Sequence, residues 1–290
     1  MAKIKRDPVT GKETTGHEWN GIEELDSPVP KVVLLFLAAT IIFSVACWIL
    51  LPTFPLGKTY TKGVLGTDQR KEVAQKVAAA QAQRQEWASR IESMSYEQIM
   101  ADPELMKVVK QTGHTLFQDN CAACHGMNAT GGPGFPDLTA KKWLWGGTPE
   151  QIAETIKVGI NGTHADTRVS QMLAFGRDGM LTQTQILDVA TYVQSLSQPV
   201  EASPERLAAG AKIFAEQCAT CHGDNGKGKQ DVGAPDLTDN SWIYGGDLNT
   251  IYKTIYGGRQ GQMPSWEGRL SPLDLKLLTV YVSTLPEAKK

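Results

Sequence analysis

One long apolar run divides the N-terminal part of the chain. From Val32 to Leu51 the sequence reads VVLLFLAATIIFSVACWILL and contains no charged residue. A helix rises about 1.5 Å per residue, so a run of this length spans roughly 30 Å, the thickness of a bilayer's hydrocarbon core. A cleaved signal peptide has a shorter apolar core and small residues at its cleavage site, which the residues before Pro52 do not offer. The pattern predicts a polar segment at 1–30 and an uncleaved transmembrane helix at 31–52.

The segment after this run, 53–107, is predicted as a spacer that contains an amphipathic helix. Between residues 68 and 91 the chain is rich in Ala, Gln and charged residues, with apolar residues on one helical face. These are Val73, Val77, Ala80, Trp87 and Ile91. Two interpretations stay open, a docking helix for a partner and a spacer helix packed on its own neighbours.

The rest of the chain is an internal repeat. The matched pairs include Gly113 with Gly210, Phe117 with Phe214, Trp143 with Trp242, Tyr192 with Tyr281, and Leu196 with Leu285. The last helix of each half has a start signal, a capping box at Thr182 in the first and Ser271 before a proline in the second. The small and polar residues from Pro199 to Pro204 form the predicted linker. The repeat predicts two helical domains, 108–200 and 201–290, each small enough that a buried cofactor would complete its core.

Each half contains one Cys-x-x-Cys-His motif. The chain has five cysteines; the motifs use Cys121, Cys124, Cys218 and Cys221, which leaves Cys47 in the apolar run. In this motif both thiols bond to a haem, and the histidine, here His125 or His222, binds the iron. A zinc ribbon needs its cysteine pairs about 15–20 residues apart, and a redox dithiol would not need histidine at the same offset twice. We therefore expect two covalently attached c-type haems in a mainly α fold of two tandem class I cytochrome c domains.

A methionine opposite the histidine closes the iron site and raises its potential, which suits electron transfer. Met263 is the only methionine after the second motif, and the repeat places Met172 at the matching position in the first half. We therefore expect the ligand pairs His125 with Met172 and His222 with Met263. Met180, just before the last helix of the first half, and His164 are the alternatives to Met172.

The charge balance excludes one class of partner. A formal net charge of −2 offers no basic face for a nucleic acid. Several side chains are candidate donors to haem propionates, with core packing or solvated surface as the other interpretation of each. These are Trp143, Trp145, Trp242, Tyr244, Arg168 and Arg259.

Two further stretches are distinctive: Thr14–Leu25, TTGHEWNGIEEL, and, after the apolar run, Tyr60–Gly66, YTKGVLG. Together with the two haem motifs, they make nearly the full length of the chain resemble the dihaem cytochrome c subunit, subunit III, of cbb3-type cytochrome c oxidases. Two departures are Val32 and Val33, where aromatic residues are frequent in the family, and Leu173, where proline often follows the ligand methionine.

This resemblance implies a subunit that is not an enzyme on its own. It implies electron transfer from a soluble or membrane-bound donor cytochrome, through a monohaem subunit, to a haem–copper catalytic subunit that reduces oxygen to water and pumps protons. It also implies a single-pass protein of the bacterial inner membrane, with its N-terminus in the cytoplasm and its haem domains in the periplasm, the side on which c-type haems are attached. The rivals are an electron-transfer subunit of another membrane complex and a dihaem cytochrome c peroxidase.

Overall fold

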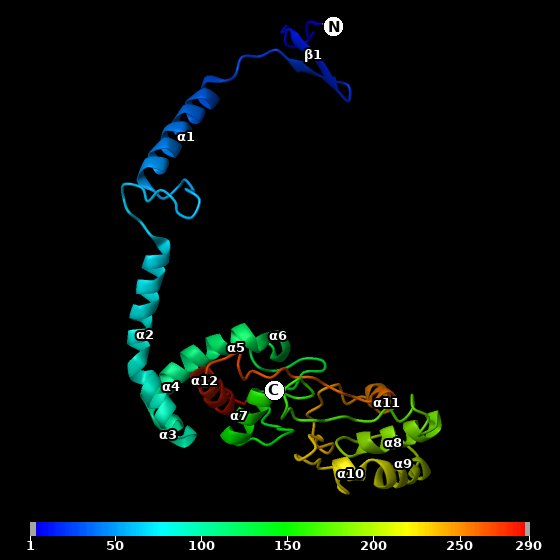
Figure 1. The fold of residues 1–290 in the computed structure, drawn as a ribbon. Helices are drawn as coiled ribbons and strands as arrows, with labels where there is room; N and C mark the ends of the chain where they lie inside the picture. Colours follow the sequence, from blue (N-terminus) through cyan, green and yellow to red (C-terminus); the bar gives the residue numbers. More distant parts are fainter. Residues whose placement is uncertain (1–3, 288–290) are drawn as a thin grey trace. The chain divides into compact units, whose positions relative to one another are not determined.

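The chain folds mainly into helices, as the sequence predicts. The computed structural model describes residues 4–287. The chain separates into two compact units, Met1–Gln83 and Arg84–Lys290, whose elements are labelled in Figure 1. Helix α2 (Gln69–Ser93) begins in the first unit and ends in the second.

The first unit opens with a β-hairpin that the sequence analysis did not predict. Strands β1 (Thr14–Trp19) and β2 (Ile22–Leu25) pair antiparallel. Asn20 and Gly21 join them with positive φ angles of 51° and 85°. Two positive φ angles in a two-residue loop are the geometry of a type I′ turn, for which Asn-Gly is the favoured pair.

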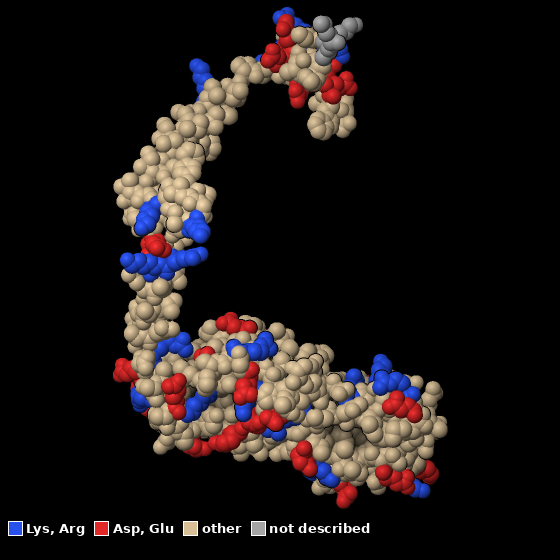
Figure 2. Space-filling view, in the orientation of Figure 1, with Lys and Arg blue, Asp and Glu red and all other residues tan. Residues whose placement is uncertain are grey.

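Helix α1 (Lys31–Leu50) occupies the apolar run, and none of its residues is buried. Figure 2 shows its surface free of charged side chains along most of its length. Within residues 4–287 it is the one helix long and apolar enough to cross a membrane. The chain then turns back, and the amides of Val64 and Leu65 donate to the carbonyls of Ile49 and Leu50 at 2.9 and 3.0 Å. These bonds satisfy carbonyls that the end of a helix otherwise leaves unpaired.

The second unit contains the end of α2 and the helices of both repeats. Its first half has α3 (Tyr96–Ala101), α4 (Pro103–Val108), the π-helical turn η1 (Val109–Gly113), α5 (His114–Asn120), α6 (Ala122–His125), α7 (Pro149–Val158) and α8 (Gln183–Ser195). Its second half has α9 (Pro204–Gln217), α10 (Ala219–His222), α11 (Leu248–Gly257) and α12 (Pro272–Ser283). Both predicted helix starts are confirmed: Thr182 forms a capping box with Gln185, and the Ser271 hydroxyl accepts from the Asp274 amide at 3.1 Å.

The two ends of α2 have different surroundings. Ile91 is fully buried, in a cluster with Leu105 and Leu277, and Trp87 packs against that cluster. Val73, in the first unit, is 58% exposed. The C-terminal end of α2 therefore packs on its own chain. This agrees with the second interpretation, a spacer helix packed on its own neighbours.

A first hydrophobic core, named here the α5–α12 core, combines early and late parts of the second unit. Its buried residues before the linker are Phe117, Ala122, Ala129, Ile152 and Ile156. Those after the linker are Trp266, Leu278, Val282 and Leu285. The last helix of the chain therefore packs with α5 and α7 of the first half (Figure 1).

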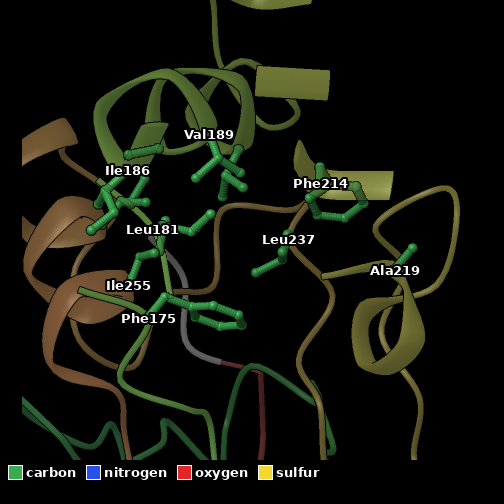
Figure 3. Close-up of a cluster of buried hydrophobic side chains, with 11 residues drawn as sticks. Phe175, Leu181, Ile186, Val189, Phe214, Ala219, Leu237 and Ile255 are labelled. Atoms are coloured by element: carbon green, nitrogen blue, oxygen red, sulfur yellow. The ribbon is translucent and has the colours of Figure 1, made fainter. Parts of the chain in front are cut away.

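The other core, named here the α8–α9 core, combines the last helix of the first half with helices of the second half. It takes Phe175, Leu181, Ile186, Val189, Ala190 and Val193 from the end of the first half. It takes Phe214, Ala219, Leu237, Ile251 and Ile255 from the second half. Figure 3 shows side chains of this core from α8, α9, α10 and α11, together with Phe175, Leu181 and Leu237 from the connecting segments.

Two tight helix crossings fix this arrangement. A Cβ on Gly210 of α9 would lie 2.3 Å from the Asp188 carbonyl oxygen and 2.7 Å from the Tyr192 Cβ, both on α8. A Cβ on Gly113 would lie 2.7 Å from the Tyr281 Cβ on α12. The repeat-matched Gly and Tyr thus meet at both crossings, but each pair joins opposite halves. Each core therefore takes helices from both sides of the predicted linker.

Candidate haem-binding sites

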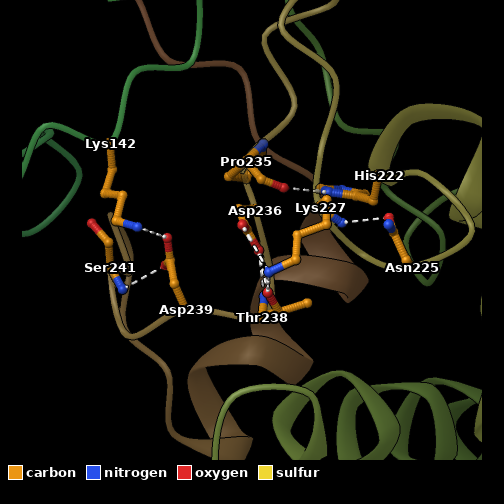
Figure 4. Close-up of polar contacts among 9 residues, drawn as sticks. All are labelled: Lys142, His222, Asn225, Lys227, Pro235, Asp236, Thr238, Asp239 and Ser241. Carbon is orange, nitrogen blue, oxygen red and sulfur yellow. Dashed lines mark hydrogen bonds and ion pairs between the residues drawn. The ribbon is translucent and has the colours of Figure 1, made fainter.

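Each Cys-x-x-Cys-His motif forms one short helical turn that ends at its histidine. His125 is the last residue of α6 and His222 the last of α10. The Nδ1 of His125 lies 3.1 Å from the Pro136 carbonyl oxygen, and the Nδ1 of His222 lies 3.1 Å from that of Pro235 (Figure 4). A carbonyl only accepts, so Nδ1 carries the proton in both rings. The Nε2 lone pair of each histidine is then available to a metal.

An aspartate closes the turn that follows each of these carbonyl groups. Asp137 follows Pro136, and its Oδ1 accepts from the amide and hydroxyl of Thr139 at 2.8 and 2.5 Å. Asp236 and Thr238 repeat this turn in the second half at 2.8 and 2.7 Å. The repeated Pro-Asp-Leu-Thr was visible in the sequence, but its role in orienting the histidines was missed. The signal that could have revealed it is the recurrence of the motif at nearly the same distance from each histidine.

Burial shifts the pKa values of the motif histidines and of the first cysteine in each motif. It lowers the pKa of His125 and of His222, although the hydrogen bond to the proline carbonyl opposes the effect. A neutral imidazole is the form that binds a metal. Burial also raises the pKa of the Cys121 and Cys218 thiols to about 11. A redox dithiol needs a lowered thiol pKa, so these cysteines do not resemble one.

The residues present fit a covalently bound haem. Each turn presents two thiols and one histidine Nε2, the donor set that the group requires. In the first half Arg168 stacks on Trp145, with its guanidinium carbon 5.1 Å from the ring centre. Its Nε is buried and has no hydrogen-bond partner among the described residues. An anionic oxygen such as that of a haem propionate would satisfy this donor.

A second arginine lies in the matching place of the other half. Arg259 stacks on Tyr244, with its guanidinium carbon 4.2 Å from the ring centre, and bonds the hydroxyl of Thr254. Trp143 and Trp242 lie against glycine pairs, where a Cβ on Gly147 or Gly246 would meet the indole ring. Of the candidate propionate donors, the Arg168 side chain is therefore the one left with a buried unpaired N–H.

The structure separates the two methionines in an unexpected way. Met172 packs against the α8–α9 core, which contains the His222 turn, and Met263 packs against the α5–α12 core, which contains the His125 turn. The structure therefore does not bring Met172 to the core of His125. The pairing of His125 with Met172 and of His222 with Met263 that was expected from sequence order disagrees with this packing.

The alternative ligands lie elsewhere. Met180 is 47% exposed. His164 has both ring nitrogens engaged: Nδ1 accepts from the Asp166 amide at 3.0 Å, and Nε2 donates to Glu267 at 2.7 Å. Neither side chain has the surroundings of an iron ligand.

The loops that follow the two motifs meet each other. Lys142 of the first loop pairs with Asp239 of the second at 3.2 Å (Figure 4). A cavity of about 590 Å³ lies between residues 130–144 and 227–245. Both histidine-bearing segments therefore belong to the same compact unit.

Three protein-family models match separate stretches of the chain. Residues 11–58 match the model of the N-terminal domain of cytochrome oxidase-cbb3, FixP. Residues 111–197 match cytochrome c, and residues 205–282 match cytochrome c oxidase, cbb3-type, subunit III. The two cytochrome c matches fall on either side of the predicted linker.

Full-length relatives give the same result. The chain is 45% identical to the cbb3-type cytochrome c oxidase subunit FixP of Bradyrhizobium sp. (strain ORS 278), over 98% of both chains. It is 43% identical to the subunit CcoP of Azospirillum brasilense over 100% of both chains, and 41% identical to that of Cereibacter sphaeroides over 94% of both. The chain therefore belongs to the FixP/CcoP family, the cytochrome c electron-transfer subunits of cbb3-type cytochrome c oxidases.

Proposed function

We propose that this subunit carries two c-type haems and relays single electrons from a periplasmic donor cytochrome, through a monohaem subunit, to the haem–copper catalytic subunit of the oxidase. The observation that carries the proposal is the repeated turn in which a histidine donates through Nδ1 to a proline carbonyl at 3.1 Å. Because the two turns are alike, each is equipped to hold one haem. When bound, the haem supplies a one-electron couple.

The residues of each turn have separate tasks. Cys121 and Cys124 hold the first haem, and Cys218 and Cys221 hold the second, by thioether bonds. His125 and His222 bind the irons, and the proline carbonyls fix the plane of each imidazole and increase its basicity. Met172 and Met263 would supply the second protein ligand of each iron, and this would leave no place for oxygen or peroxide. The subunit is therefore a relay, and the chemistry of oxygen takes place in its partner.

The proposed topology combines the apolar helix with the side of the membrane on which c-type haems are attached. Helix α1 crosses the inner membrane, with residues 1–30 in the cytoplasm and both cytochrome c domains in the periplasm. Its length and its uncharged surface support the crossing, and the attachment of c-type haems in the periplasm supports the orientation. Confinement to the membrane surface raises the effective concentration of the haem domains next to membrane-bound partners.

Haem counting and oxygen uptake test the relay. We expect two covalent haems per chain in the purified protein, and a copurified haem–copper subunit in mild detergent. Replacing His222 should strongly reduce oxygen uptake driven by a reduced cytochrome, while the spectrum of the haem–copper centre stays unchanged. Undiminished turnover in that variant would mean that electrons bypass the second haem.

Protease accessibility tests the topology. In spheroplasts, protease added outside should digest the cytochrome c domains and spare the first thirty residues. A chain whose N-terminal segment is digested under these conditions, while its haem domains are protected, would have the opposite orientation.

A further inference from the structure

The last helix of each half belongs to the core of the other half, and the connecting segments carry the two methionines. The first segment leaves α7 and runs through Met172 to α8; the second leaves α11 and runs through Met263 to α12. Since α7 and α12 share one core and α8 and α11 the other, each segment passes from one core to the other. The two segments therefore cross.

Backbone hydrogen bonds hold each methionine at this crossing. The amides of Ile160 and Met263 each donate to the other's carbonyl at 2.9 Å. Met172 and Arg259 make the same reciprocal pair at 2.8 and 3.1 Å. The backbone of each methionine is thus hydrogen-bonded to the connecting segment of the other half.

Two glycines allow the close approach at these pairs. Gly159, with φ +70°, and Gly258, with φ +68°, follow α7 and α11. A Cβ on Gly159 would lie 2.5 Å from the Met263 carbonyl oxygen, and a Cβ on Gly258 would lie 2.5 Å from that of Met172. The same arrangement, a glycine next to the backbone of a methionine, therefore occurs at both pairs.

Asn161 ties the two segments together. Its Nδ2 donates to the Ser170 carbonyl of its own segment at 2.7 Å and to the Gly261 carbonyl of the other segment at 2.7 Å. Its Oδ1 accepts from the Ser170 amide at 3.0 Å. This residue lies in the stretch of the first half that has no counterpart in the second, so the extra length contributes directly to the crossing.

We infer that the iron ligands are exchanged between the halves: His125 and Met263 bind one iron, and His222 and Met172 bind the other. This inference rests on the proposed presence of two haems. The α5–α12 core holds Ala122 of the first haem motif with Met263, and the α8–α9 core holds Ala219 of the second motif with Met172. Each haem thus takes its two axial ligands from different cytochrome c repeats.

Paired substitutions in the full-length protein distinguish the two pairings. The readout is the number of methionine-ligated ferric haems, taken from the sulfur-to-iron charge-transfer band and from the low-spin signal in electron paramagnetic resonance. Met172→Ala alone should remove one of the two methionine-ligated haem signals. The double variant with His222→Gly should keep the other signal, because both changes affect the same haem. The double variant with His125→Gly should lose both signals. Met180→Ala is the control and should leave both signals.

The reverse pattern would overturn the inference: a second loss with His222→Gly and none with His125→Gly. The result is valid even where a histidine variant loses its haem, because the haem that remains is the one counted. A haem count below two in the unaltered protein would instead refute the two-haem proposal, independently of the pairing.

Cleavage of the linker gives a second readout that needs no ligand substitution. A protease site inserted between Pro199 and Pro204 in the full chain allows the two halves to be cut after folding. With exchanged ligands the cut halves stay together, and separating them in mild denaturant removes both methionine signals. If each half kept its methionine-ligated haem after separation, the ligands would come from within each half. This outcome would overturn the inference even if both paired variants failed to fold.

Discussion

The crossing of α8 and α9 at Gly210 yields a stability prediction of defined size. A Cβ at this position would lie 2.3 Å from the Asp188 carbonyl oxygen, whereas ordinary contacts begin at 3.4 Å. Gly210→Ala therefore requires the two helices to move apart by about 1 Å, and overpacking of this kind costs about 1–3 kcal/mol. The gain from replacing glycine inside a helix offsets about 0.5–1 kcal/mol of this cost. Since the contact is with backbone, which does not rotate away, we expect the cost at the upper end of that range and a net loss of stability of about 2 kcal/mol.

A matched control lies in the same half. Gly257, the last residue of α11, has nothing within 4 Å of the position of its Cβ. Gly257→Ala should therefore leave stability unchanged or raise it by up to about 1 kcal/mol. The two variants make the same chemical change, so their difference measures the crossing alone.

Thermal unfolding of the haem-loaded protein, followed by circular dichroism, compares the variants. For a unit of about 200 residues, 1 kcal/mol corresponds to a change in Tm of about 2–4 °C. The Tm of Gly210→Ala should then fall by about 4–8 °C, while that of Gly257→Ala should not fall. Equal melting temperatures for the two variants would refute the tight crossing of α8 and α9.

Three further predictions concern the ligand segment, the acid limb and the apolar helix. Gly159→Ala should displace Met263, whose carbonyl oxygen would lie 2.5 Å from the new Cβ, and reduce the charge-transfer band of one haem; an unchanged band would contradict this. Burial raises the pKa of Asp236, but the hydrogen bonds from Thr238 and the positive charge of Lys227 together outweigh burial and hold the pKa below its usual range. Its stabilising effect is therefore present above the unfolded pKa of about 3.9 and is lost as the pH falls through the lower folded value, so Asp236→Asn should flatten the acid limb of a stability–pH curve. Thr40→Arg, in the middle of α1, should cost about 2.5–3.5 kcal/mol of membrane insertion and lower the fraction of the protein found in membranes after alkaline washing.

Local sequence signals predicted the helix starts and the haem motifs because each depends on a few neighbouring residues. The capping box at Thr182, the Ser271 N-cap and the histidine after each cysteine pair are of this kind. The hairpin of β1 and β2 also had such a signal, the Asn20-Gly21 pair, which the sequence analysis did not use. The glycines at the helix crossings were recognised as repeat-matched residues, although their partners were not.

The exchange of the last helices could not be predicted from the sequence because the two final helices carry matched residues. Tyr192 and Tyr281 are matched residues, as are Leu196 and Leu285, so either final helix offers similar contacts to either half. Sequence similarity identifies which positions correspond, but it does not say which copy of a helix occupies them. The choice depends on the connecting segments and on long-range bonds such as the one from Asn161 to Gly261.

An exchanged core changes how the two haem environments depend on each other. If each half formed its own core, one could unfold while the other kept its ligands. Here the α8–α9 core needs α8 from the first half, and the α5–α12 core needs α12 from the second. Loss of either half therefore removes a helix, and by our inference a methionine, from the other. Because native contacts shared in this way form and break together, we expect the two proposed haem sites to unfold as one cooperative unit, and a substitution near one site to change the stability of both.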